Sequence, residues 1–229
     1  MFKRFTSYFF GTAILLFSSQ HANATLFTLG NDGVDSTVSS LVGTETAVEY
    51  YDYRGFVGHA DFDRRDDAGY FWLYEDSRSG DLSLGVLLDD PDTAGSGGHA
   101  RITFDNLPSS YHVDIAEENR DGRDELGANG ANSAYGDWRW LAGFGDGGLI
   151  GGLEGNLWNI SVVIHEYSGI EDWFFVNGPS TYSSDLILLN GEDFTLATIP
   201  EPSALFLIAA GLMGWTVMRR KHMVTTRLH

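Results

Sequence analysis

The stretch LWNISVVIHEYSGIEDWFFV, residues 157–176, decides the fold class of this chain. In its first half, large apolar residues occupy every second position from Trp158 to Ile164, which is the pattern of a strand with one buried face. Ser168-Gly169 then marks a turn, because glycine adopts positive φ without strain. A second run, rich in aromatic residues, follows from Asp172 to Val176. The stretch therefore predicts two strands joined by a short turn.

Runs of the same kind recur along residues 25–199, and no stretch sustains a helical period over three turns. Dipeptides such as Asp32-Gly33, Ser79-Gly80, Asp146-Gly147 and Asn190-Gly191 separate them as predicted turns. The predicted strands are Thr46–Tyr53, Gly69–Glu75, Leu82–Leu88, Ala100–Phe104, Tyr111–Ala116, Leu157–Glu166, Asp172–Val176, Asp185–Leu189 and Phe194–Thr198. The polar segment Asn119–Gly136 is predicted to be a long loop. Together these features predict an all-β domain, a two-sheet β-sandwich of jelly-roll type.

Composition limits what this domain binds. Residues 25–199 contain 31 acidic and 8 basic residues, which gives a net charge of −23 with histidine neutral. Such a charge repels nucleic-acid phosphates and anionic lipids, so we expect no nucleic-acid partner. The chain has no cysteine, which excludes disulfides, thiol catalysis and Cys-ligated zinc.

The N-terminus, residues 1–24, has the pattern of a secretory signal peptide. Lys3 and Arg4 precede an apolar run from Tyr8 to Phe17, which is too short to span a membrane. The small residues Ala22 and Ala24 then form an A-x-A cleavage site. We expect signal peptidase to cleave there, so that the mature chain begins near Thr25 and residues 25–199 form the exported domain.

The C-terminus combines three signals: the tripeptide Pro200-Glu201-Pro202, an apolar run from Ser203 to Met218, and the basic cluster Arg219-Arg220-Lys221. A helix over this run measures about 24 Å against a hydrocarbon core of about 30 Å, so it spans only marginally. The basic cluster is a stop signal on the cytoplasmic side, with residues 222–229 as a cytoplasmic tail. Two alternatives stay open, a buried C-terminal helix of the domain and a permanent single-pass anchor.

Residues 200–221 together resemble the PEP-CTERM sorting domain of Gram-negative bacteria that make extracellular polysaccharide. The resemblance implies that Pro200, Glu201 and Pro202 are recognised by an exosortase, a membrane transpeptidase. It also implies an inner-membrane intermediate held by a transient helix, followed by delivery to the cell envelope or the exterior. The extension His222–His229 departs from the family pattern, which usually ends at or just past the basic cluster.

Two acidic segments are candidate calcium sites, because calcium prefers clustered carboxylate and amide oxygens. Their candidate ligands are Asp89, Asp90 and Asp92 in the first segment, and Glu117, Asn119 and Asp121 in the second. The second segment imitates the first half of a calcium loop, but position twelve is Ala128 where an EF-hand needs glutamate. The alternative for both segments is a solvated acidic surface.

A further metal hypothesis rests on His59, Asp61 and Asp63, which would share one face of an extended strand. The plain polar face of an edge strand explains the same spacing equally well.

The sequence offers little for catalysis. The histidines at 59, 99, 112 and 165 lack a nucleophile-elbow serine or a zincin partner. Glu45 and Glu49 are the carboxylates whose spacing suits a retaining glycosidase on a sandwich fold. We therefore expect a non-enzymatic structural or binding module of the cell envelope or extracellular matrix. The alternative is a secreted polysaccharide-active enzyme or a carbohydrate-binding module, with extracellular polysaccharide as its partner. Two of the residues Trp138, Trp140, Trp158 and Trp173 would then be exposed as a stacking platform, although we expect most of the four to lie in the core.

Overall fold

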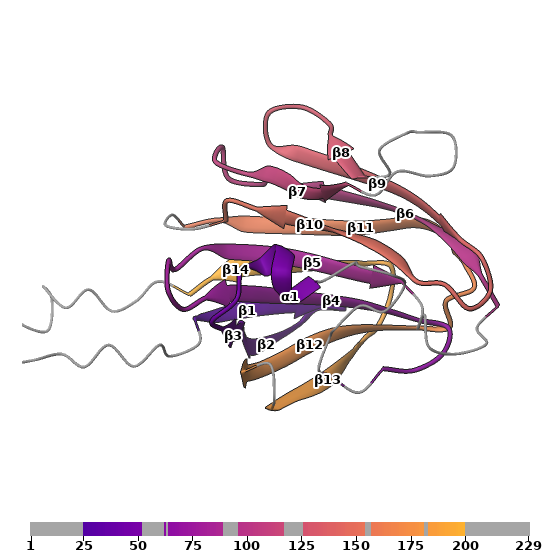
Figure 1. The fold of residues 1–229 in the computed structure, drawn as a ribbon, viewed down its shortest axis with the longest axis horizontal. Helices are drawn as coiled ribbons and strands as arrows, with labels where there is room; N and C mark the ends of the chain where they lie inside the picture. Colours follow the sequence, from indigo (N-terminus) through magenta and orange to yellow (C-terminus); the bar gives the residue numbers. More distant parts are fainter. Residues whose placement is uncertain are drawn as a thin grey trace, which may run out of the picture.

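In the computed structural model of the chain, the described residues are 25–51, 62, 64–88, 96–116, 126–153, 157–180 and 183–199. They form two β-sheets and one short helix (Figure 1). The predicted C-terminal helix lies outside the described residues. Within the described ranges, no helix has the length and apolar character needed to cross a membrane.

The first sheet, sheet A, is antiparallel throughout. Its strands lie in the order β2 (Val34–Ser39), β1 (Leu26–Asn31), β14 (Asp193–Thr198), β11 (Asn159–Ser168), β6 (Gly98–Asp105), β9 (Ser133–Trp140) and β8 (Leu126–Ala128).

The second sheet, sheet B, is mixed, because β4 pairs in parallel with β12 and β3 and antiparallel with β5. Its strands lie in the order β13 (Ser183–Leu189), β12 (Asp172–Ser180), β4 (Ala68–Asp76), β5 (Leu82–Leu88), β10 (Asp146–Gly151) and β7 (His112–Ala116), with β3 (Leu41–Gly43) also on β4.

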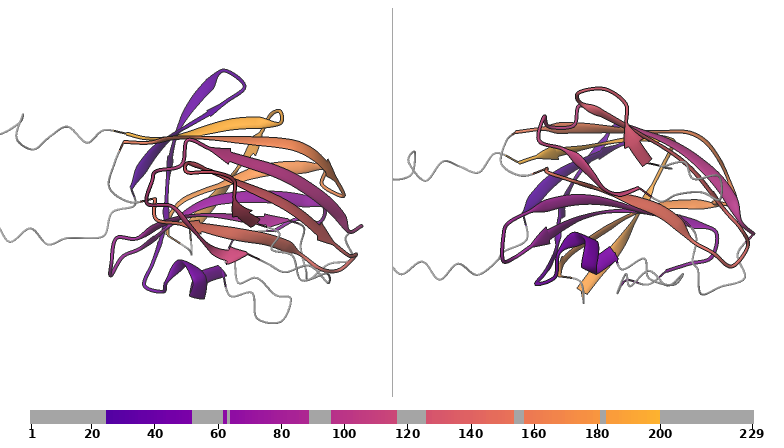
Figure 2. Two further views of the ribbon diagram at one scale, coloured as in Figure 1. Left: turned by 90° about the horizontal axis from the view of Figure 1, so that it is seen from above. Right: turned by 45° about the horizontal axis from the view of Figure 1, so that its top comes forward.

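The two sheets face each other across one apolar core, which is the arrangement of a β-sandwich (Figure 2). Sheet A contributes residues such as Phe104 and Val162, and sheet B contributes residues such as Phe71 and Val86. These side chains alternate with outward-facing ones along β6 and β11. The all-β, two-sheet prediction is confirmed, whereas the jelly-roll connectivity stays a prediction.

A second apolar layer covers the outer face of sheet B. The helix α1 (Ala47–Tyr51) lies on this face (Figure 2) and packs Tyr50 and Tyr51 against it. The aromatic rings of β4 on this side, Tyr70, Trp72 and Tyr74, are fully or almost fully buried. β4 is therefore buried on both faces, which is unusual for a strand with antiparallel pairing on one edge.

Two glycines make room for tryptophans in this doubly covered sheet. Gly85 is paired directly with Trp72, and Gly69 is paired directly with Trp173. A Cβ atom at either glycine would collide with the indole ring of its partner. Glycine is therefore required at these positions by close packing.

The prediction of a strand over Thr46–Tyr53 is wrong, because residues 47–51 form α1. Thr46 and Glu49 make a capping box at its start. The amide of Glu49 donates to Thr46 Oγ1 at 3.1 Å, and the amide of Thr46 donates to Glu49 Oε2 at 2.8 Å. This T-x-x-E pattern satisfies two free amides and favours a helix start over a strand.

The prediction of a loop over Asn119–Gly136 is also wrong in its described part, which contains β8 and the start of β9. Small residues, Ala134 and Gly136, occupy the inward positions of β9 beside Trp138 and so hide the apolar alternation. Likewise, Asp146-Gly147 begins the buried strand β10 instead of forming a turn. The strands β1, β2 and β3 were not predicted either. β2 has one buried apolar residue, Val38, and β3 has three residues, so neither shows an alternating pattern, whereas β1 was missed although Phe27 and Leu29 alternate with Thr28.

We predict that Gly85→Ala destabilises the domain by about 1–3 kcal/mol, since the added methyl group must displace the Trp72 ring in a packed layer. Urea denaturation followed by tryptophan fluorescence measures the change. Gly127→Ala in β8 is the matched control, because nothing lies within 4 Å of its Cβ position. Equal denaturation midpoints for the two variants would contradict this account of Gly85.

Candidate functional site

The last strand, β14, leads directly to the predicted sorting tripeptide. β14 lies between β1 and β11, and it ends at Thr198, which is paired with Phe27 of β1. Because β1 and β14 are antiparallel, the beginning of β1 and the end of β14 lie at the same end of the sandwich (Figure 1). We call this end, where Thr25 and Ile199 lie, the terminal pole.

Trp158 holds the end of β14 on the sandwich through hydrogen bonds and ring packing. The amide of Thr198 donates to the carbonyl of Trp158 at 3.2 Å, and the amide of Trp158 donates to Thr198 Oγ1 at 3.2 Å. The buried indole of Trp158 stacks on Phe27 with a centroid distance of 5.4 Å and donates to the carbonyl of Leu153 at 2.7 Å. The chain is thus held in place up to the residue at which the tail begins.

Three exposed apolar side chains form a row across the terminal pole. Continuing the strand register past Thr198 places Ile199 opposite Leu26 on one side and Leu157 on the other. Their exposed fractions are 37%, 52% and 72%, respectively. All three face outward, because their strand neighbours Phe27 and Trp158 point into the core.

An open cleft of about 530 Å³ adjoins this row. Residues 106–110, which follow β6, line one side, and residues 157–159 line the other. The lining residues that the structure describes are apolar or carry amide and hydroxyl groups, and none of them is titratable.

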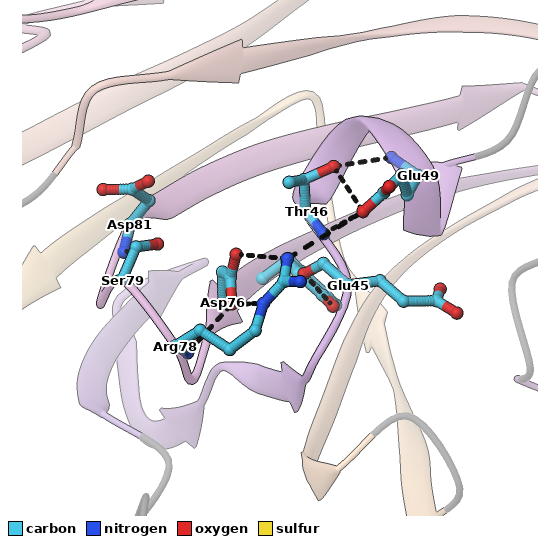
Figure 3. A network of polar contacts seen from close by, with 8 residues as sticks. Glu45, Thr46, Glu49, Asp76, Arg78, Ser79 and Asp81 are labelled. Atoms are coloured by element: carbon cyan, nitrogen blue, oxygen red, sulfur yellow. Dashed lines mark hydrogen bonds and ion pairs between the residues drawn. The ribbon is translucent and has the colours of Figure 1, made fainter.

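A polar network lies at the same end of sheet B, in the turn between β4 and β5 (Figure 3). The guanidinium of Arg78 donates to both carboxylate oxygens of Asp76, at 3.1 and 3.0 Å. The Asp76 side chain is 7% exposed, so its charge is stabilised mainly by this pair. The hydrogen bonds from Arg78 hold the pKa of Asp76 below its usual value.

Glu45 and Glu49, whose spacing suits a retaining glycosidase, do not face each other. Glu49 uses its carboxylate to cap α1, and the hydrogen bonds from Thr46 lower the pKa of Glu49. Figure 3 shows the side chain of Glu45 pointing away from this cap. The Glu45 carbonyl accepts a hydrogen bond from the Tyr74 hydroxyl at 2.9 Å.

The described histidines each have a local polar partner. His99 lies 2.9 Å from Ser168 Oγ and 3.3 Å from Glu166, and His112 lies 3.0 Å from Asp114. His165 lies 2.7 Å from Thr103 Oγ1. His99, Thr103 and His165 belong to neighbouring strands of sheet A, whereas His112 lies on β7 of sheet B, so the three histidines do not converge on one site.

The candidate calcium ligands Asp89, Asp90, Asp92, Glu117, Asn119 and Asp121 lie outside the described residues, as do His59, Asp61 and Asp63. Ala22, Ala24, the tripeptide Pro200-Glu201-Pro202 and the basic cluster Arg219-Arg220-Lys221 lie outside them as well. Among the residues that are described, no group of three or more His, Asp or Glu side chains is placed to hold a metal ion.

The tryptophans considered as a glycan platform are core residues. Trp138, Trp140, Trp158 and Trp173 are all buried. The expectation that most of them are core residues is confirmed, and none of the four is exposed as a stacking platform would require.

Comparison with known families bears on the tail. The model for the PEP-CTERM protein-sorting motif matches residues 198–221. The resemblance noted in the sequence is confirmed, and it is consistent with an exosortase substrate. The motif implies an exported protein destined for the cell envelope or the extracellular space. No similar protein was found among the curated proteins.

The matched motif begins at Thr198, the residue that ends β14, so the folded domain and the sorting signal adjoin without a linker. Sequence reasoning placed the tail correctly but missed the apolar row at the terminal pole. Leu26, Leu157 and Ile199 are far apart in the chain, and only the strand register brings them together.

We predict that Asp76→Asn lowers the free energy of unfolding by about 1–2 kcal/mol at pH 7, because it breaks the ion pair with a half-exposed arginine. The pKa of Asp76 is lower in the folded protein than in the unfolded chain, where it is about 4. The ionised Asp76 therefore stabilises the fold fully above pH 4, and this stabilisation is lost as the pH falls through the folded-state pKa. The difference from wild type should therefore shrink as urea denaturation is repeated from pH 6 down to pH 3.

Asp81→Asn, in the same turn, is the matched control, because its carboxylate points away from Arg78 (Figure 3). A loss of stability for Asp76→Asn that is constant from pH 6 to pH 3 would argue against the charge as its cause.

Proposed function

We propose that this protein is an exported, non-enzymatic structural or binding module of the cell envelope or extracellular matrix, which an exosortase-like enzyme releases at its C-terminal tail. The observation that carries the proposal is the direct continuation of β14 into the matched sorting motif.

The tail holds the terminal pole close to the membrane in this proposal. Residues 203–218 form the transient membrane helix, and only the tripeptide Pro200-Glu201-Pro202 separates it from Ile199. Three extended residues span at most about 11 Å. The sorting enzyme therefore acts in a narrow gap between the sandwich and the lipid surface.

The apolar row suits this arrangement. Leu26, Leu157 and Ile199 flank the point where the tail leaves the domain, and each is more than one-third exposed. Partial insertion into the lipid surface costs apolar side chains less free energy than it would cost charged side chains. The row and the adjoining cleft are the surface that we propose meets the lipid or the sorting enzyme before release.

Calcium binding at the opposite end is a second part of the proposal. The candidate segments begin after Leu88 of β5 and after Ala116 of β7, and both strands pair with β10. Leu88 is paired with Asp146, and Ala116 is paired with Gly148. Both strands therefore end beside the start of β10, at the same end of sheet B. Because only β10 separates β5 from β7, we propose that carboxylates following these two strand ends bind one ion.

We expect the protein exported by a host that carries the sorting enzyme to begin near Thr25 and to lack the helix from Ser203 onward. Mass spectrometry of protein from the envelope and the medium measures both ends. Substitution of Pro200, Glu201 and Pro202 by alanine should leave the tail attached, since the recognised residues are gone.

Glu192→Ala, in the turn before β14, is the matched control and should be processed normally, because Glu192 is exposed and lies outside the matched motif. Wild-type protein that keeps Arg219–His229 in a host with an active sorting enzyme would refute release at the tail.

We also predict that calcium raises the melting temperature of the exported domain by several degrees. At a free concentration of about 100 times the dissociation constant, one site contributes about 2.7 kcal/mol. Asp89→Ala with Asp92→Ala should abolish the shift if the first segment binds the ion, and Asp121→Ala should do so if the second does.

Magnesium at equal ionic strength is the control, since charge screening acts alike for both ions whereas calcium accepts more ligands. Equal melting temperatures in calcium, magnesium and chelator would mean that the acidic segments form only a solvated surface.

A further inference from the structure

Glu75, near the end of β4, binds the first described residue of the chain. Its Oε2 atom accepts hydrogen bonds from the Thr25 amide at 3.2 Å and from the Thr25 hydroxyl at 2.7 Å. The hydroxyl of Ser40 donates to the same oxygen at 3.1 Å. Three donors thus converge on one carboxylate oxygen.

None of these donors is charged. Glu75 is paired with Val42 of β3 and with Leu82 of β5, and neither carries a charge. The nearby Asp76–Arg78 pair belongs to the other face of β4, because successive side chains alternate. Among the described residues, no ion pair to Glu75 is present. The half-buried carboxylate is therefore a site suited to a cation.

The Thr25 nitrogen has too few protons for its two acceptors while it is part of a peptide bond. Its single N–H is shared between Glu75 Oε2 and Ser40 Oγ, which lies 3.1 Å away. A free α-amino group carries three N–H donors and a positive charge at neutral pH. It would supply each acceptor separately and neutralise Glu75.

We propose that Glu75 is the binding site for the α-ammonium group of Thr25, which is created when the signal peptide is removed. The proposal rests on the export step of the proposed function but not on release at the tail. A peptidase hydrolyses the Ala24–Thr25 bond with one water molecule, leaving a carboxylate on Ala24 and an ammonium group on Thr25. The ammonium then forms an ion pair with Glu75 at the position that the amide occupies.

This ion pair ties three parts of the fold together. Thr25 precedes the first strand of sheet A, and Glu75 lies on the central strand of sheet B. Ser40, which is fully buried, is the residue at which the chain passes from β2 in sheet A to β3 in sheet B. Its amide donates to the Thr25 carbonyl at 3.0 Å. Signal-peptide removal thereby strengthens the junction between the sheets at the terminal pole.

The chain itself provides a selective probe of this group. Its two lysines are Lys3 and Lys221, so residues 25–199 contain no side-chain amine. Amine acylation at a series of pH values, read by peptide mass spectrometry, therefore reports the pKa of the Thr25 α-amino group alone. The protein is taken from the periplasm or envelope of a host that expresses the full-length chain, and N-terminal sequencing identifies its first residue.

We expect the exported protein to begin at Thr25 and its α-amino pKa to lie about one unit above the ordinary value of about 7.7–8.0. Glu75→Gln should return the acylation midpoint to the ordinary value, and so should unfolding of the wild-type protein in urea. Glu192→Gln, at an exposed glutamate in the turn before β14, should keep the wild-type midpoint.

The raised pKa of the Thr25 α-amino group also predicts how the stability of the domain depends on pH. The ion pair contributes fully below the unfolded pKa of about 8 and is lost as pH rises through the folded value. The denaturation midpoint of the wild-type protein should fall toward that of Glu75→Gln between about pH 8 and pH 10.

Two results would overturn the proposal. One is a wild-type midpoint that is the same in the folded and the urea-unfolded protein. The other is a first residue other than Thr25, which would leave export and tail release intact. The unfolding comparison uses wild-type protein only, so the test stands even where Glu75→Gln fails to fold.

Discussion

The burial of β4 on both faces is the constraint on which the rest of the structure depends. Phe71 and Leu73 point into the core between the sheets, while Tyr70, Trp72 and Tyr74 point outward. A strand with such a sequence must be covered on its second face, because exposed aromatic surface of this size is costly in water. The helix α1 supplies part of that cover, and its capping box holds it in place.

The same constraint explains the glycines and the mixed pairing. Large indole rings fit over neighbouring strands only where the facing residue lacks a side chain, as at Gly69 and Gly85. β4 is a central strand with β5 on one edge and the parallel strands β3 and β12 on the other. Strands buried on both faces are typical of parallel pairing, in which neighbouring layers cover the sheet.

This organisation gives the molecule two different ends. At the terminal pole, β1 begins beside the end of β14. Glu75 and Ser40 bind Thr25 at the beginning of the described chain, and Trp158 binds Thr198 near its end. The sorting motif starts at the last residue so held. At the other end, β5 and β7 stop beside the start of β10, where acidic segments follow in the sequence. The attachment point and the acidic segments therefore follow strand ends on opposite sides of the sandwich.

Strands with a strong local hydrophobic pattern were predicted correctly from the sequence, and elements without one were not. The run Leu82–Leu88 was predicted with the bounds that the structure has, because an unbroken apolar run between polar turns has few other solutions. β9 was missed, since its inward glycine and alanine carry no hydrophobic signal of their own. α1 was predicted as a strand although its T-x-x-E cap was present, because five residues are too few to display a helical period.

The sequence by itself determined the all-β class, the lack of disulfides, the acidic charge and the sorting tail, because each depends on composition or on adjacent residues. Only the tertiary structure decided which residues meet at the terminal pole. Thr25 and Glu75 are separated by 50 positions, and Leu26 and Ile199 lie at opposite ends of the described chain. Contacts of this kind depend on sheet order and strand register, which arise from the packing of the whole core and not from any local pattern.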